Sequence, residues 1–167
     1  SETGLNTAMG AAGEVAGAGN LWSELTMANF HGCLELLPDE HHEGASWICR
    51  RAFFHGVWEQ VEVAQSGSPE AKASSGVARQ FLGYPVEFTS KMPTSEANSQ
   101  RCVFFGNFMN AVVIGDRRAI ETAMSDEYAF DEDVTTVRVT QRIDINVHEA
   151  SDATTAKAVV AIETAAA

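Results

Sequence analysis

The stretch from Val134 to His148, VTTVRVTQRIDINVH, decides the fold of this chain. From Thr135 onward its odd-numbered positions are mostly apolar and none of its even-numbered positions is. This alternation predicts a half-buried strand with one solvent-facing side. At about 3.3 Å per residue the strand would span roughly 46 Å, whereas a compact domain of 167 residues is about 40 Å across. The strand must therefore bend, carry a bulge or project beyond the body.

A projecting strand would favour a protein that works in an assembly. The strand exposes unpaired backbone donors and acceptors, and in a monomer these can pair with other chains and cause aggregation. In an assembly the same groups and side chains can meet neighbouring molecules. The length of this segment therefore favours a structural subunit, and a bulged strand inside an ordinary sheet is the alternative.

The N-terminal half of the chain predicts helices and one short strand. Residues 1–20 hold five Gly and five Ala and offer little apolar surface to bury, so they are expected to form a flexible leader. Thr26 is a plausible N-cap for a helix that Pro38 ends. Residues 45–50 predict a buried strand, and the apolar spacing over 53–61 predicts a second short helix.

The pattern changes to strands in the second half of the chain. Residues 65–76 predict a flexible loop. Short strands are then expected over 84–92, 103–105, 111–114 and 119–123, the last two separated by a tight turn at Gly115–Arg118. Because helices come first and strands later, without regular alternation, the sequence predicts an α+β fold.

Composition excludes several classes of function. The chain has 11 Lys and Arg residues against 23 Asp and Glu residues, a net charge of −12. A protein that binds nucleic acid by neutralising phosphates needs a basic face, so this balance argues against specific nucleic-acid recognition. No stretch approaches the 18 or so apolar residues of a membrane helix. Cys33, Cys49 and Cys102 are odd in number and widely spaced, which predicts reduced thiols in the core.

Residues that could carry chemistry are few. The run Asp39–Glu43, DEHHE, is the one cluster with metal-ligand chemistry, but adjacent ligands converge only where the backbone turns sharply. The patterns GxSxG, GxxxxGK[ST] and GxGxxG are absent from the sequence. We therefore expect no catalytic residue and no cofactor. A small metal-dependent hydrolase that uses Asp39–Glu43 is the alternative.

Charged residues suggest a contact between copies of the chain. Arg117 and Arg118 lie on the predicted turn, and acidic residues follow at 126–127 and 131–133. Arginine's planar guanidinium suits carboxylate pairing across an interface. Self-association through these opposite charges predicts that raising the ionic strength weakens the association.

Three segments then follow one another in a familiar order. They are FLGYPVEFTSKMP at Phe81–Pro93, VFFGNFMNAVVIGDRRAIE at Val103–Glu121 and YAFDEDVTTVRVTQRIDINVHEAS at Tyr128–Ser151. Together they resemble the closing half of the major capsid proteins of tailed bacteriophages and prophages. The matching motif positions are Gly83–Val86, Phe105–Phe108, Gly115–Arg118, and Phe130 with Arg138, Arg142, Asp144 and Val147.

The resemblance implies an α+β fold of the HK-ninety-seven type, with an axial and a peripheral domain. Residues 21–125 would hold mainly axial-domain helices and sheet. Residues 126–167 would hold the long strand and the C-terminal strand of the peripheral domain. The N-terminal arm, extended loop and spine helix of that family have no counterpart in the segment. Some relatives crosslink their subunits covalently, but Asp133 and Thr140 stand where an Asn and a Glu would be needed, so no crosslinking is expected.

The resemblance also implies a function and partners. The chain would be a subunit of pentamers and hexamers in an icosahedral phage head, made in the bacterial cytoplasm and located in the virion. Its partners would be copies of itself and other head proteins such as the portal and scaffold, with no membrane partner. A nanocompartment shell protein of the same fold is a further alternative. The predicted subunit-interface residues are Arg117, Arg118, Asp131, Asp133, Arg138, Arg142 and Asp144.

Overall fold

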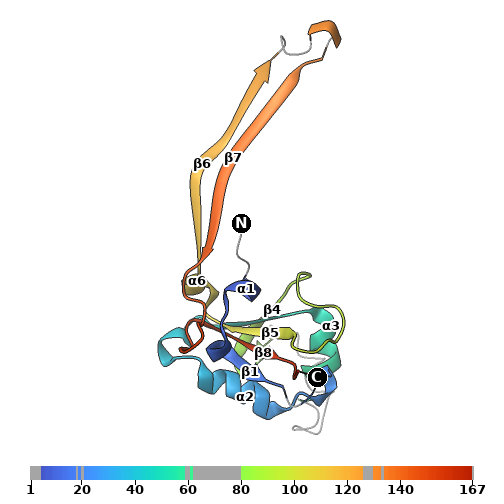
Figure 1. Ribbon diagram of the computed structural model, residues 1–167, viewed down its shortest axis with the longest axis vertical. Coiled ribbons are helices and arrows are strands. Elements are labelled where there is room, and N and C mark those ends of the chain that lie inside the picture. Colours follow the sequence, from blue (N-terminus) through green and yellow to red (C-terminus); the bar gives the residue numbers. More distant parts are fainter. Residues whose placement is uncertain are drawn as a thin grey trace.

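The computed structural model divides the chain into a body and a long projecting ribbon (Figure 1). The structure describes residues 5–17, 19, 21–58, 61, 80–125, 130–132 and 134–166. The predicted loop at 65–76 lies outside these described residues. The body contains a six-stranded sheet, and the ribbon is a separate two-stranded sheet. Helices and strands are mixed in the body, so the α+β prediction is confirmed.

The body sheet has the strand order β1-β8-β5-β2-β4-β3. Its strands are β1 (Glu14–Ala16), β2 (Ser46–Cys49), β3 (Gln80–Phe81), β4 (Tyr84–Phe88), β5 (Arg101–Gly106) and β8 (Val159–Glu163). The pairs β1/β8 and β2/β4 are parallel, and the pairs β2/β5, β5/β8 and β3/β4 are antiparallel. The predicted buried strand at 45–50 is confirmed as β2, which lies between β5 and β4.

Helices border this sheet, apart from η5 (Phe130–Glu132), which lies at the tip of the ribbon (Figure 1). They are α1 (Leu5–Ala8), η1 (Ala11–Gly13), η2 (Trp22–Glu24), α2 (Met27–Leu36), η3 (Asp39–His41), α3 (Arg51–Phe53), η4 (Phe54–Trp58) and α6 (Phe108–Ala111). Helix α2 has the predicted bounds. Thr26 is its N-cap, with the Thr26 backbone N–H donating to Asn29 Oδ1 at 2.9 Å, and it ends before Pro38. The second predicted helix begins as α3 and continues as the π-helical η4.

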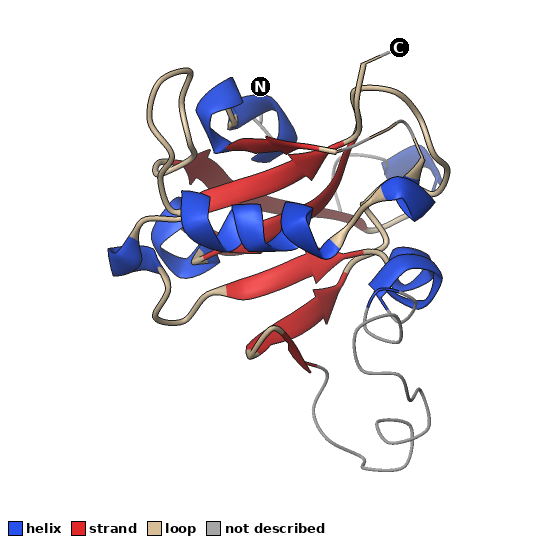
Figure 2. Cartoon of the chain, turned by 90° about the horizontal axis from the view of Figure 1, so that it is seen from below, coloured by secondary structure: helices blue, strands red, loops and turns tan. Residues whose placement is uncertain are grey.

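Each face of the body sheet has its own apolar core. Helix α2 lies across one face (Figure 2), where Phe30 and Cys33 pack with strand residues such as Trp47. Aromatic rings dominate this side, and Trp58 stacks on Phe81 with 4.4 Å between ring centroids. The other face is buried by the N-terminal segment and by α6, in a cluster that includes Met9. Burial on both faces explains why β5 and β8 read as continuous apolar runs rather than as alternating strands.

The N-terminal segment corrects one prediction. The described part of residues 1–20 is not a flexible leader, because it forms α1, η1 and the edge strand β1. Its glycines allow the backbone of this segment to lie directly against residues 151–153 of the body. A Cβ at Gly10 would lie 2.3 Å from the Asp152 carbonyl carbon, and one at Gly13 would lie 2.3 Å from Ser151 Cβ. The segment is therefore ordered by fitting tightly against the body rather than by burying large side chains.

The ribbon consists of β6 (Val112–Ser125) and β7 (Thr136–Val147), paired antiparallel. Strand β7 is the predicted long strand, and it projects from the body (Figure 1). The two short strands predicted at 111–114 and 119–123 are wrong as separate elements, because β6 is continuous through both. Gly115 forms no turn and pairs with Asp144. The pairing register shifts between Asp116 and Glu121, so bulges absorb the irregular sequence instead.

One further expectation is wrong in detail. The long strand is not half-buried within this chain, because most residues of β6 and β7 are exposed. The division expected at residue 125 stays a prediction, and it falls between β6 and its partner β7. Strand β8 lies in the body sheet. Strand pairing thus joins β6 and β7 in one unit.

Candidate functional site

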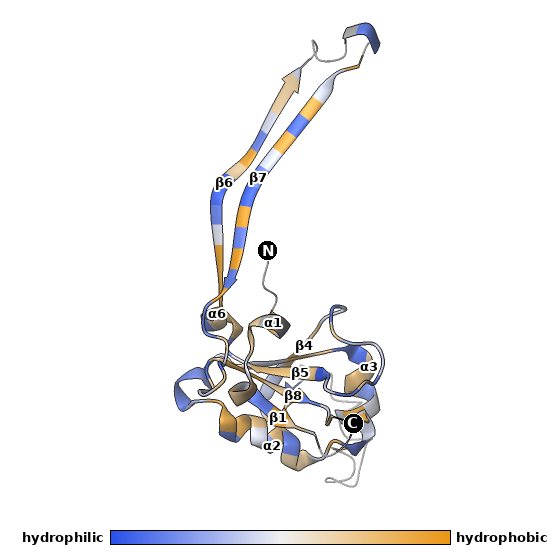
Figure 3. Cartoon of the chain, viewed as in Figure 1, coloured by the Kyte–Doolittle hydropathy of each residue, from blue (hydrophilic) through white to orange (hydrophobic). Residues whose placement is uncertain are grey.

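The candidate site is the ribbon, whose two faces differ in chemistry. Strand β7 alternates along its length between apolar and polar residues (Figure 3). Because directly paired residues of an antiparallel ladder share a face, the register aligns Ile145 with Ile114 and Val137 with Met124. Ile114 is 68% exposed, Met124 76% and Val139 59%. One face of the ribbon therefore presents apolar side chains to solvent along most of its length.

We call this surface the apolar ribbon face. Its apolar members are the side chains that alternate outward on that side of both strands. They are Ile114, Ile120, Met124, Val137, Val139, Ile143 and Ile145. Asp116 and Thr122 lie among these residues on the same face. Monomeric proteins rarely expose this many large apolar side chains on one side, and such surfaces mark interaction sites. The sequence analysis found the β7 half of this face but missed the β6 half, because the bulges between Asp116 and Glu121 interrupt its alternation.

The opposite face of the ribbon carries three of the predicted arginines, and we call it the arginine face. Arg142 is paired directly with Arg118, and Arg138 lies opposite Ala123. Like charges directly across a strand pair are destabilising. The Arg118 guanidinium is offset by Glu121, with 3.3 Å between Nη1 and Oε2. This cationic surface stands on a chain with a net charge of −12.

The other predicted interface residues lie in different places. Asp144 pairs with Gly115 on the arginine face, towards the base of the ribbon. Arg117 is exposed within the irregular part of β6. Asp131 is exposed in η5, at the tip of the ribbon. Asp133 lies outside the described residues. The structure thus brings four of the predicted residues onto one face, and it places Asp131 at the far end of the ribbon.

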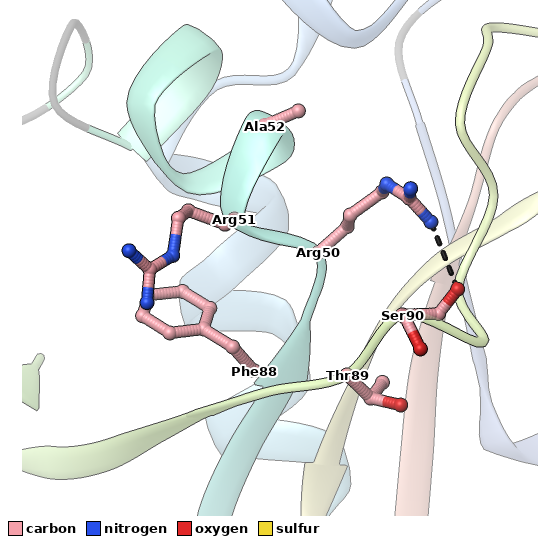
Figure 4. Close-up of a pocket in the computed structure, with 6 residues that line it drawn as sticks. All are labelled: Arg50, Arg51, Ala52, Phe88, Thr89 and Ser90. Atoms are coloured by element: carbon pink, nitrogen blue, oxygen red, sulfur yellow. Dashed lines mark hydrogen bonds between the residues drawn. The ribbon is translucent and has the colours of Figure 1, made fainter.

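A shallow cavity of about 250 Å³ lies on the body (Figure 4). It is lined by Arg50, Arg51, Ala52, Phe88, Thr89 and Ser90. Arg50 Nη1 donates to the carbonyl oxygens of Ser90 and Met92, both at 2.9 Å. The Arg51 guanidinium lies 5.2 Å from the centre of the Phe88 ring. Arg50 thus holds the loop after β4, and Arg51 packs on the last residue of β4. The lining of this cavity within the described chain includes no carboxylate, imidazole or thiol.

The three cysteines are packing residues. All three thiols are free and buried. Burial raises the pKa of Cys49 and of Cys102 to about 12, and it raises the pKa of Cys33 as well. Since the thiolate is the nucleophilic form, these groups stay protonated and unreactive at neutral pH. This agrees with the prediction of reduced core thiols.

The acidic and histidine-rich run at Asp39–Glu43 does not converge. The His42 ring points into the body, where Nδ1 lies 2.8 Å from Tyr84 Oη and Nε2 lies 3.1 Å from the Leu37 carbonyl oxygen. His41 Nε2 faces Glu40 Oε1 at 3.4 Å. Within the described residues, no group of three His, Cys, Asp or Glu side chains is arranged to hold a metal ion. The described residues of this run therefore do not form the metal site that the hydrolase alternative requires.

No helix in the described part of the chain has both the length and the apolar composition required to span a membrane.

Comparison with known proteins gives one family. The model of the phage capsid family matches residues 2–157. No curated protein matches the sequence. Solved structures similar to the chain include the capsid of an empty GTA particle (TM-score 0.67, 19% identity) and the capsid of a native GTA particle (TM-score 0.67, 20% identity). A structure from Mycobacterium phage Adephagia follows, with a TM-score of 0.51 and 15% identity.

The extent of these matches is unequal. They cover 99%, 99% and 98% of this chain but 57%, 56% and 54% of the solved chains. The chain therefore spans a little over half the length of the structures it matches. At identities of this level the likeness is one of fold.

Proposed function

The chain belongs to the phage capsid family, and on that premise we propose that it is a structural subunit of an icosahedral phage or prophage head. Its fold is the HK-ninety-seven type that the resemblance implied, as the likeness to the GTA capsids shows. The subunit works through contacts with copies of itself rather than through catalysis. Pentamers and hexamers of this subunit form the shell around packaged DNA.

The observation that carries this proposal is the exposed apolar ribbon face. Seven large apolar side chains there meet solvent in the isolated chain. Full burial of one such side chain contributes about 1.5–3 kcal/mol. Partial burial of several side chains against a neighbour is therefore enough to drive association. The body sheet is already covered on both faces within the chain, so the exposed apolar side chains are concentrated on the ribbon.

The arginine face supplies the polar part of the proposed contact. Arg118, Arg138 and Arg142 present guanidinium groups that pair well with carboxylates. The acidic partners proposed in a neighbouring copy are Asp131, which is exposed at the ribbon tip, and Asp133. Arg117 and Asp144 complete the interface set. These contacts fix the orientation of neighbouring subunits more than they add affinity.

The resemblance extends the proposal to the rest of the head. The body would be the axial domain, and the ribbon would lie in the peripheral domain. Strand β8 then belongs with the axial domain, because it pairs with β5 in the body sheet. Other head proteins, such as the portal and scaffold, are the proposed additional partners. A net charge of −12 suits a shell that encloses DNA without gripping its phosphates.

The direct test is to place charges on the apolar ribbon face. The double variant Val139→Glu with Ile143→Glu is expected to abolish particle formation, as seen by electron microscopy, in cells that express the gene encoding this chain. Burying two carboxylates in an apolar contact is unfavourable. The body should keep its thermal unfolding transition, because neither residue contributes to it.

A matched control separates loss of the face from damage to the ribbon. Thr136→Glu with Asn146→Glu adds the same two charges to β7, at positions near the two ends of the strand that alternation places on the opposite face, away from the Arg118–Arg142 pair. This variant should still form particles. Normal particles from the double variant, or a wild-type protein that never assembles under any condition, would contradict the proposed function.

A further inference from the structure

Three charged side chains meet where the N-terminal strand joins the body sheet. Strand β1 is an edge strand of three residues that pairs with β8 alone. The registers place Glu163 of β8 between Ala16 of β1 and Arg101 of β5. Glu14 is two residues before Ala16, so it lies on the same face of the sheet. Two carboxylates and one guanidinium are therefore aligned across three strands.

Arg101 connects the N-terminal segment to the sheet. Its Nε donates to Glu14 Oε1 at 2.9 Å, and its Nη2 donates to the same carboxylate oxygen. Nη2 also donates to the Met9 carbonyl oxygen at 3.2 Å. The distance from Nε to Glu163 Oε2 is 3.6 Å. One side chain on β5 thus holds two points of the N-terminal segment, Met9 and Glu14, and it does so across the intervening strand β8.

The cluster carries one more negative charge than positive charge in a poorly hydrated place. The three side chains are only 16% to 24% exposed. Burial and the neighbouring Glu14 carboxylate raise the pKa of Glu163, and Arg101 opposes this only in part. Helix α2 also packs on β1 and β8. Its residues His31 and Glu35 are solvent-exposed, and its buried Cys33 thiol stays uncharged because burial raises its pKa. Glu14 and Arg101 are therefore the charged groups that face Glu163 within the described chain.

We propose that Glu14, Arg101 and Glu163 form a proton-sensitive latch that holds strand β1 on the body sheet more firmly in mildly acidic solution than at neutral pH. One proton lets the two carboxyl groups share a hydrogen bond while Arg101 neutralises the remaining charge. At neutral pH both carboxylates are ionised and repel each other, so local opening of β1 becomes less costly. The latch is a property of the single subunit and does not depend on shell assembly.

The sign of the pH dependence follows from linkage. Glu163 binds its proton more tightly in the closed state than when β1 is open, so protonation favours the closed state. The stabilisation is complete below the ordinary pKa of glutamate, and it is lost as the pH rises through the raised pKa of Glu163. The Gly17 N–H donates to the Glu163 carbonyl oxygen and not to its carboxylate, so protonation does not remove this bond directly and acts only on how often β1 opens.

The test measures how easily β1 opens. Hydrogen exchange of the Gly17 amide, which donates to Glu163 O at 2.6 Å, reports detachment of β1 from β8. After correction for intrinsic rates, its protection factor should fall by at least about twofold between pH 4.5 and pH 7.5. The amide of Ile48 in the central strand β2 should show no such change. A Gly17 protection factor that is independent of pH would overturn the proposal.

Two variants assign the effect to the cluster. Glu163→Gln mimics the protonated carboxyl, so its Gly17 protection should stay at the acidic level at both pH values. Glu87→Gln removes an exposed carboxylate of β4, far along the sheet order from β1, and should keep the wild-type pH dependence. If Glu163→Gln keeps the wild-type dependence, the latch is not at this cluster.

A titration of the wild-type protein keeps the proposal testable if Glu163→Gln fails to fold. The carboxyl carbon of Glu163, followed by NMR, should titrate above the ordinary range for glutamate. Glu14→Gln should lower that midpoint, because it removes the repelling charge and leaves Arg101 to Glu163. An ordinary midpoint in the wild-type protein would refute the latch. All of these measurements use the unassembled chain, so their failure and a failure of particle formation are separate results.

Discussion

The body and the ribbon differ in where they place their large apolar side chains. In the body, large side chains such as Trp47 and Phe105 are fully buried, and both faces of the sheet are covered. In the ribbon, residues of the same apolar type face solvent along both strands. The body therefore holds its stability within one chain, whereas the ribbon needs a second surface to bury its apolar side chains. A change in the body should act on folding, and a change in the ribbon should act on association.

The largest expected difference between the two regions comes from truncating an apolar side chain in each. Trp47→Ala should lower the free energy of unfolding by about 3–5 kcal/mol, because Trp47 lies at the centre of the aromatic cluster and its Nε1 donates to the Phe81 carbonyl oxygen at 3.1 Å. Val139→Ala should change it by less than about 0.5 kcal/mol in the unassembled chain. Denaturant unfolding measures both values. Equal losses of unfolding free energy in the two variants would contradict the difference between body and ribbon.

A pair of glycines gives the next contrast. Gly106 in β5 has a φ of 149°, and a Cβ there would lie 2.1 Å from the Ala158 carbonyl oxygen. Gly106→Ala should therefore destabilise the body by more than about 1 kcal/mol. At Gly115 in β6 the nearest atom to an added Cβ is the Asp144 carbonyl oxygen at 3.8 Å. Gly115→Ala should be neutral or slightly stabilising, as thermal unfolding of the two variants can establish.

The smallest expected effect is on the ribbon itself. Arg142→Thr removes one of two like charges that face each other across the strands. The ribbon of the unassembled chain should become more stable by a few tenths of a kcal/mol, measured as slower hydrogen exchange of β6 and β7. Subunit association should become weaker and less sensitive to salt, because an interfacial cation is lost. Stronger association of this variant would argue against the arginine face as an interface.

Local signals in the sequence account for the elements that were predicted correctly. Thr26 and Pro38 bound α2, and the alternation after Thr135 identifies β7. These features depend on neighbouring residues, so the sequence displays them directly. The arginines of the ribbon were selected by residue type and by the motif positions of the resemblance, and their role at an interface stays a prediction.

The errors occur where distant residues decide the structure. Gly115 and Asp116 are typical turn residues, but pairing with β7 extends them into a continuous strand. The small residues of the N-terminal segment suggested flexibility, yet they allow the close contact with Asp152. Strand β8 follows the ribbon in sequence and returns to the body because β5 and β1 pair with it. The face-to-face placement of Arg118 and Arg142 also required the register of the ribbon.

One measurement tests the central claim most directly, namely hydrogen exchange of the free subunit and of the assembled particle, compared segment by segment. Exchange should slow strongly in residues 112–125 and 136–147 on assembly, because neighbouring copies cover the ribbon, while strands β2 and β5 of the body should change little. A ribbon that exchanges as fast in the particle as in the free subunit would contradict the account.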